Sequence, residues 1–343
     1  MIFEETAHAD GGIVTAEKTG FYVEKKQHPV RFWTRIRRAA RARLVAFAMS
    51  IAQRTLPHLS RRRVVALARG MGALAAACDR NGSRVAAANL QILCGRKLSE
   101  RRTRLLVRGC YVRAAQIALD CVWFGRDTRT RVDAWTRREA ILDVTKLRPA
   151  LVVAGHFGNW EMMLLMGGFL NVPMTAVVKH QWSSALTEHL NELRTTLGVK
   201  VVFADGALRP LLKTLKDGGV AGFLLDQYTA PHEGGLWVDF GGLPGCVSGA
   251  VALLSRRTGA PVWIVYPLAR KDGRYEFRCA PTMQLAEGET DTAFTQRITN
   301  ELVRIFKRYP SQWMLMYPRW MRIPPGVPAE GFPFYSKPLE KHP

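Results

Sequence analysis

The sequence has 343 residues and a hydrophobic composition of 48%, so the chain is long enough to bury one large core or two small ones. Its formal net charge at pH 7 is +22, and +18 of this charge lies in residues 1–150, which carry 30 basic and 12 acidic residues. A positive field of this kind attracts phosphate groups on nucleic acid or lipid headgroups, or an acidic protein that carries a substrate. The charge alone does not choose among these partners.

The six cysteines are scattered along the chain and argue against a cross-linked or zinc-binding domain. They form no CxxC pair and lack the close Cys and His spacing of a zinc site. We therefore interpret them as reduced thiols in a cytoplasmic compartment. A signal peptide is not expected, because residues 1–12 lack a basic start followed by an apolar stretch.

The first segment with a clear character is RFWTRIRRAARAR, residues 31–43, which follows an expected flexible tail over residues 1–29. It contains six arginines beside Phe32 and Trp33 and leads into the apolar run 44–52. Arginines beside aromatic residues suit a helix that lies at an anionic membrane surface. The apolar run is far shorter than the ~20 residues that cross a bilayer, so no transmembrane helix is expected. A solvated basic helix face or a nucleic-acid-binding segment would show the same pattern.

Residues 60–140 show apolar positions at three- and four-residue spacing, which is typical of amphipathic helices. The helical segments are VVALARGMGALAAA, RVAAANLQIL and RTRLLVRGCYVRAAQIALDCVW, separated by turns such as Asp79 to Gly82. Together with the arginine-rich segment they predict a basic helical region over residues 30–140, close to a membrane surface.

Beyond about residue 145, short aliphatic runs alternate with amphipathic stretches. The runs are ALVVAG, VPMTAVV, VKVVFA, VAGFLLD and PVWIVYPLA. This alternation predicts an α/β core over residues 141–325, with a mixed, mainly parallel sheet flanked by helices.

The end of the predicted core has two further elements. RKDGRYEFRCAP predicts a hairpin at Asp272-Gly273, so part of the sheet should be antiparallel. A final helix should end near Pro310, before a C-terminal tail over residues 326–343. Its apolar stripe consists of Phe294, Ile298, Leu302 and Ile305.

The stretch LVVAGHFGNWE places a histidine and a glutamate around a bend that follows a buried strand. Two glycines allow a tight backbone near His156, and Asn159 can cap a helix that carries Glu161 in its first turn. Ligand crevices of open α/β sheets lie at the carboxyl ends of the strands, where His156 would stand. A neutral imidazole held by a carboxylate can act as a general base toward a hydroxyl that attacks a thioester. The same residues could instead only cap the helix and complement its dipole.

Several downstream segments, taken in order, resemble one known family. They are GHFGNWE, Arg194 ahead of LGVKVV, LKDGGVAGFLLDQ, GLWVDFGGLPGCVSGAVALLSRRTGAPV and PSQWMLMYPRW, preceded by RVAAANLQIL. Between about residues 40 and 322 the chain resembles the bacterial lipid A late acyltransferases, of the lauroyl/myristoyl transferase type, within the HxxxxD/E glycerolipid acyltransferase superfamily. The resemblance implies transfer of an acyl chain from acyl carrier protein to a hydroxyl of a lipid A precursor, at the cytoplasmic face of the bacterial inner membrane.

The resemblance also implies roles for single residues. His156 would be the catalytic base and Glu161 its orienting partner. Arg194 could contact a phosphate of the acceptor or of pantetheine, because a guanidinium matches phosphate oxygens, although a surface arginine is the simpler alternative. Asp226 follows a buried strand and would face the same crevice, unless it only caps a turn. The predicted substrate-binding set consists of Asn159, Arg194, Asp226 and Gln227.

Acceptor, donor and reaction each keep an alternative. The chain has Tyr317-Pro318-Arg319-Trp320 where the family more often has His-Arg-Arg before an aromatic residue, so a different glycolipid or a phospholipid is an alternative acceptor. Acyl-CoA is the alternative donor. A membrane-associated thioesterase and a nucleic-acid-binding protein are the alternatives from other classes. We expect no metal or redox cofactor, and the sequence contains no HExxH motif of a metalloenzyme. We expect direct attack without an acyl-enzyme, because the sequence contains no GxSxG elbow and no serine or cysteine nucleophile next to His156.

Overall fold

The computed structural model describes residues 48–95, 97–179, 181 and 184–339. They belong to one compact unit, Ala46–Pro343, and a second unit, Met1–Val45, lies outside the described residues. The expectations for the tail 1–29 and for the arginine-rich segment 31–43 fall outside them as well. The predicted domain boundaries therefore stay predictions.

In the described residues the core is a seven-stranded sheet with the order β1-β9-β8-β2-β5-β3-β4. Neighbouring strands are parallel, except that β8 and β9 form an antiparallel hairpin. This confirms the expected mixed, mainly parallel sheet. The strands are β1 (Thr136–Arg137), β2 (Ala150–Ala154), β3 (Met174–Val178), β4 (Lys200–Phe203), β5 (Val220–Leu224), β8 (Val262–Ala269) and β9 (Tyr275–Cys279).

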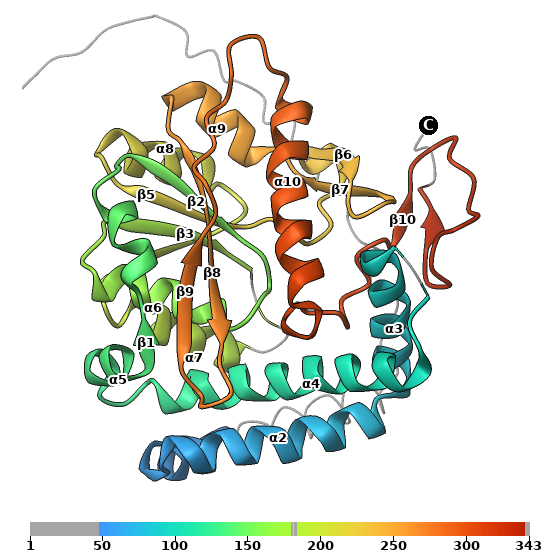
Figure 1. Cartoon of the computed structure of the whole chain (residues 1–343). Coiled ribbons are helices and arrows are strands. Elements are labelled where there is room, and N and C mark those ends of the chain that lie inside the picture. Colours follow the sequence, from blue (N-terminus) through green and yellow to red (C-terminus); the bar gives the residue numbers. More distant parts are fainter. Residues whose placement is uncertain (1–47, 96, 180, 182–183, 340–343) are drawn as a thin grey trace, which may run out of the picture. The chain divides into compact units, whose positions relative to one another are not determined.

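Alternating side chains of the strands supply two hydrophobic cores, one on each face of the sheet. Leu151 and Val153 of β2 pack with α8, α9 and α10, whereas Ala150 and Val152 pack with α5, α6 and α7. Figure 1 shows α10 crossing one face of the sheet. These helices are α5 (Thr128–Trp135), α6 (Glu161–Phe169), α7 (Ser184–Thr195), α8 (Leu208–Lys216), α9 (Ala250–Thr258) and α10 (Asp291–Arg308).

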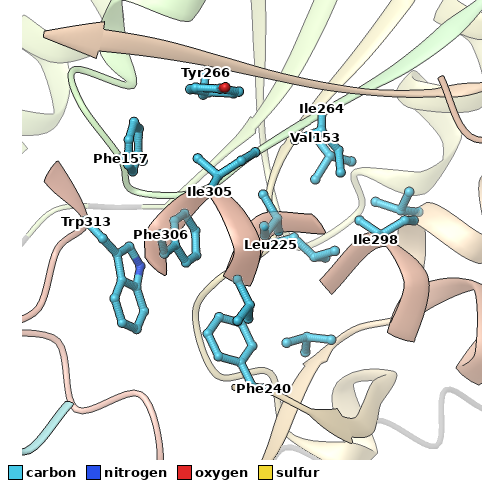
Figure 2. Close-up of a cluster of buried hydrophobic side chains, with 14 of the residues drawn as sticks. Val153, Phe157, Leu225, Phe240, Ile264, Tyr266, Ile298, Ile305, Phe306 and Trp313 are labelled. Atoms are coloured by element: carbon cyan, nitrogen blue, oxygen red, sulfur yellow. The ribbon is translucent and has the colours of Figure 1, made fainter. Parts of the chain in front are cut away.

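The core beneath α10 contains a group of stacked aromatic rings. Phe306 of α10 stacks on Phe157 and on Trp313, with centroid separations of 5.9 and 4.9 Å, and Phe240 stacks on Trp313 at 5.9 Å. Figure 2 shows these rings together with the aliphatic side chains of the strands. Each ring comes from a different segment, so their packing joins the loop after β2 to the C-terminal part of the chain.

Two long helices, α2 (Arg61–Cys78) and α4 (Glu100–Trp123), pack antiparallel at the carboxyl end of the parallel strands (Figure 1). Arg61 pairs with Asp120, and its Nε and Nη2 donate to the carbonyl oxygen of Gly273, in the turn that follows β8, at 3.0 and 2.7 Å. Farther along, Gly72 lies so close to α4 that an added Cβ would be 2.3 Å from the Cα of Val112. The short α3 (Arg80–Cys94) connects the two.

Part of the exposed surface of α2 is also apolar. Leu67, Met71 and Leu74 are 40, 44 and 66% exposed. Arg62 and Arg63 are exposed at the start of the helix, which contains no acidic residue. A helix with apolar residues on both sides is unusual in contact with water alone. None of the helices in the described residues combines the length and apolar composition needed to span a bilayer.

The hairpin expected at Asp272-Gly273 and the final helix are confirmed. Gly273 has φ +91° between the antiparallel strands β8 and β9. Helix α10 buries all four predicted stripe residues and ends at Arg308. The helix α4 is likewise present over the predicted apolar pattern.

Two local expectations differ from the structure. The expected strands did not include GLWVDFGGLPG, but β6 (Gly235–Asp239) and β7 (Pro244–Ser248) form an antiparallel hairpin there. Its turn contains Gly241 and Gly242 at φ +80° and +114°, where side chains are strained, so these glycines serve the turn. The break between α2 and α3 is the single residue Asp79, whose side chain accepts from the first turn of α3. A second small sheet joins β10 (Arg322–Ile323) to β11 (Lys337–Pro338).

The close packing of α2 on α4 predicts opposite effects for two glycines of the same helix. Gly72→Ala should destabilise the protein by roughly 1–3 kcal/mol, because the new methyl group overlaps the backbone of Val112. Gly70→Ala, with nothing within 4 Å of the added carbon, should stabilise it by roughly 0.5–1 kcal/mol. Urea unfolding of both variants measures the difference. Equal midpoints would show that the helices are farther apart in solution.

Candidate active site

The loop between β2 and α6, residues 155–160, has a backbone that only glycine permits at one point. Gly158 has φ +59°, and an added Cβ would lie 1.7 Å from the carbonyl oxygen of Pro267. The amide of Gly158 donates to the carbonyl of Gln312 at 2.8 Å, and the amide of Met314 donates to the carbonyl of His156 at 2.9 Å. The loop is therefore fixed to the segment 312–314, which follows α10.

His156 is held by Asp226. The imidazole Nδ1 lies 2.7 Å from Oδ1 of Asp226, and the backbone amide of His156 donates to Oδ2 at 2.9 Å. The indole Nε1 of Trp313 donates to the same Oδ2 at 2.7 Å. Asp226 follows β5, which neighbours β2 in the sheet, so both residues stand at adjacent carboxyl ends as the sequence predicted.

Asp226 is buried, yet its environment favours the carboxylate. Burial by itself would raise the pKa of Asp226, but the charge and hydrogen bonds of His156 and Trp313 together hold the pKa below its ordinary value. This carboxylate contributes stability above its unfolded pKa, and the contribution is lost as the pH falls through the lowered folded pKa. An ionised Asp226 can only accept, so Nδ1 of His156 carries the proton.

The other imidazole nitrogen, Nε2, lies beside Gln227. With Nδ1 protonated, Nε2 is the basic atom, and the amide nitrogen of Gln227 lies 3.2 Å from it. The ring of Trp160 packs edge-on against the imidazole at a centroid separation of 4.9 Å. The side chain of His156 is 15% exposed, whereas that of Asp226 is 3% exposed. This arrangement offers a base at the surface of the site with a buried carboxylate behind it.

Glu161 does not occupy the position that the resemblance implied. Its Oε1 and Oε2 accept from Nη2 and Nε of Arg194, both at 2.7 Å, and Oε1 also accepts from the indole of Trp160 at 3.1 Å. Asp226, not Glu161, orients His156, because Glu161 begins α6 and faces α7, which carries Arg194. A direct catalytic contribution of Glu161 stays a prediction.

Arg194 and Asn159 also lie differently from the expected substrate-binding set. Arg194 is buried, and two of its guanidinium nitrogens donate to the carboxylate of Glu161. Burial would lower the pKa of this guanidinium, but Glu161 raises the pKa above its ordinary value. Asn159 is 1% exposed, and its side chain does not cap α6, whose N-cap is Trp160. The substrate contacts predicted for Arg194, Asn159, Asp226 and Gln227 stay predictions.

Sequence reasoning missed two tryptophans of the site. Trp313 and Trp160 contact the carboxylates of Asp226 and Glu161 respectively. Both lie inside the quoted motifs, but residue type alone does not show that Trp313 bonds to Asp226, which is distant in sequence, or that Trp160 bonds to its own neighbour Glu161. In the described residues no group of three His, Cys, Asp or Glu side chains is arranged to hold a metal ion.

The model of one protein family, bacterial lipid A biosynthesis acyltransferase, matches residues 32–322. This match covers most of the chain. The chain belongs to the bacterial lipid A biosynthesis acyltransferase family. It is therefore an acyltransferase, and the family indicates a lipid A-type acceptor. No curated protein matches the chain.

The buried pair of Glu161 and Arg194 predicts a large loss of stability when one partner is neutralised. Glu161→Gln should lower the free energy of unfolding by about 3–5 kcal/mol, because a buried guanidinium loses its carboxylate. The matched control is Glu100→Gln, which breaks an exposed pair with Arg104 and should cost less than about 1 kcal/mol. Chemical denaturation compares the two. Similar small losses would mean that Arg194 does not depend on Glu161.

Proposed function

We propose that the protein transfers a fatty acyl chain from an acyl carrier protein thioester to a hydroxyl group of a lipid A precursor, with His156 as the general base. The observation that carries this proposal is the pair of His156 and Asp226 at the carboxyl end of the sheet, in a chain of this family. The buried carboxylate fixes the Nδ1 proton and leaves Nε2 as the proton acceptor.

The proposed reaction is one direct acyl transfer. Nε2 of His156 takes the proton of the acceptor hydroxyl while the oxygen of that hydroxyl attacks the thioester carbonyl. The tetrahedral intermediate collapses, the carbon–sulfur bond breaks, and the proton passes to the leaving thiol. Asp226 stabilises the imidazolium that forms between these steps. In the described residues, the side chains that bond to or pack on the imidazole are Asp226, Gln227 and Trp160, and none is a serine, threonine or cysteine, which favours a route without an acyl-enzyme.

Glu161 contributes in this proposal through the shape of the loop. Its pair with Arg194 fixes the first turn of α6 directly after the catalytic bend. Glu161 also accepts from the indole of Trp160, which packs against His156. The dyad that the resemblance implied is thus divided, with Asp226 acting on His156 directly and Glu161 acting through its neighbours.

We propose further that the protein lies on the cytoplasmic face of the inner membrane, with α2 toward the bilayer. The exposed Leu67, Met71 and Leu74, with arginines and no acidic residue on the same helix, suit an anionic lipid surface. Helix α2 contacts the turn after β8, so it lies at the end of the sheet where His156 stands. The positive charge of the chain also suits an acidic carrier protein as donor.

The direct test is mass spectrometry of lipids after the purified protein is incubated with an acyl carrier protein thioester and a lipid A precursor. We expect one added acyl chain, with His156→Ala lowering the rate by about 10²- to 10⁴-fold and Asp226→Asn by about 10²-fold or more. Full activity of His156→Ala would refute the mechanism.

The same experiment separates the alternatives. Acylation of another glycolipid in a mixed extract would keep the chemistry and change the acceptor. Release of free fatty acid, independent of any lipid acceptor, would identify a thioesterase. Equal rates with acyl-CoA would remove the carrier protein from the proposal.

Membrane attachment is tested by cosedimentation with anionic vesicles. Leu67→Gln with Leu74→Gln should weaken binding by roughly tenfold or more, because each leucine loses apolar burial in the bilayer. Leu147→Gln, at an exposed leucine before β2 at the opposite end of the sheet, is the matched control. Raised salt should weaken the wild type as well. Unchanged binding of the double variant would exclude α2 as the contact surface.

A further inference from the structure

The loop between β2 and α6 sends a third polar side chain in a direction that the proposed mechanism does not use. His156 bonds to Asp226 and Glu161 bonds to Arg194. Between them Asn159 is directed into the protein and is 1% exposed. Its amide nitrogen donates to the hydroxyl of Tyr275 at 3.2 Å and to Oδ2 of Asp120 at 3.4 Å.

Asp120 is the centre of a buried cluster. Its two oxygens accept from the two terminal nitrogens of Arg61, and Oδ2 also accepts from the hydroxyl of Tyr275. Asp120 is 1% and Arg61 2% exposed. Because the carboxylate only accepts, the nitrogen of the Asn159 amide must be the atom that faces it, which fixes the orientation of this side chain.

The cluster is anchored to three elements that are separate from the loop. Arg61 comes from α2, Asp120 from α4 and Tyr275 from β9. Arg61 also donates to the carbonyl of Gly273, and the hydroxyl of Tyr275 accepts from the amide of Gln116 at 3.0 Å. Fully bonded buried ionic groups have few alternative positions, so the cluster presents a rigid acceptor to the loop.

We infer that Asn159 is a positioning residue, through which the cluster of Arg61, Asp120 and Tyr275 fixes the bend that carries His156 and begins α6. This inference rests on the proposed function of His156. Asn159 stands three residues after His156, and its backbone carbonyl accepts from the amide of Met162 in the first turn of α6 at 3.1 Å. The side chain therefore restrains the bend and the helix start together.

A positioning role differs from the substrate contact predicted for Asn159. The side chain is buried, and its donor group is directed to Asp120 and Tyr275 rather than to the exposed side of His156. Loss of the restraint should leave substrate binding unchanged and displace the base from the attacking hydroxyl. A displacement of about 1 Å in such a geometry can cost a factor of 10² in rate.

The experiment measures kcat and KM for donor and acceptor in the acyl-transfer assay with Asn159→Ala, Tyr275→Phe and the double variant. We expect kcat to fall about 10- to 100-fold in Asn159→Ala with both KM values unchanged. Tyr275→Phe keeps the ring and removes one acceptor of the Asn159 amide, so kcat should fall by a smaller factor. The double variant should be no slower than Asn159→Ala alone, because both changes break the same connection.

The control is Thr299→Val, which replaces a fully buried threonine of α10 whose hydroxyl has no hydrogen-bond partner in the part of the chain that the structure describes, and which should leave kcat unchanged. A raised KM with unchanged kcat in Asn159→Ala would overturn the inference in favour of a substrate contact. Full kcat with only a lower melting temperature would reduce the cluster to a stabilising role. If Asn159→Ala does not fold, Tyr275→Phe decides alone, and a wild-type kcat in that variant overturns the inference.

His156→Ala, run in the same assay, separates this inference from the proposed function. A fully active His156→Ala would remove the proposed function, whatever Asn159→Ala does. An inactive His156→Ala beside a fully active Asn159→Ala would remove only the positioning role.

Discussion

An imidazole serves as a base only while its other nitrogen keeps a proton, and this requirement organises the loop between β2 and α6. Asp226 meets it from the end of the neighbouring strand β5, and Trp313 and the His156 amide keep that carboxylate charged although it is buried. The carboxylate would be costly in this place without such donors. The stacking of Trp313 on Phe306 of α10 therefore supports a side chain that donates to Asp226.

Each polar residue of the bend is fixed by a different part of the chain. The segment after β5 holds His156, α4 and β9 hold Asn159, and α7 holds Glu161. The backbone of the bend is tied in addition to the segment that follows α10. Helix α4 takes part in both hydrophobic cores, so it joins the two faces of the sheet at the end where the site lies.

The fold was readable from the sequence because aliphatic runs of strand length alternate with helical patterns after residue 145. His156 and Asp226 could be placed at one edge for the same reason. Their direct contact could not, because it depends on β5 lying beside β2 although β3 and β4 come between them in the chain. Glu161 is nearer in sequence and was assigned to the histidine, but the turn at Gly158 directs it toward α7. Strand order and loop geometry thus decide which side chain each carboxylate contacts, and neither can be inferred from the spacing of residues in the sequence.

The run Arg61-Arg62-Arg63 begins α2 with one inward and two outward arginines. The inward one is bonded to Asp120 and to the turn after β8, while its neighbours are exposed on the helix that we assign to the lipid surface. A fragment shortened from the N-terminus, to avoid the need for detergent, must therefore still contain Arg61. A fragment that starts after α2 would discard the proposed membrane contact, but it would also leave Asp120 without its counter-charge inside the protein. A full-length variant with polar residues in place of the exposed ones of α2 would keep Arg61 beside Asp120 and still remove the apolar surface.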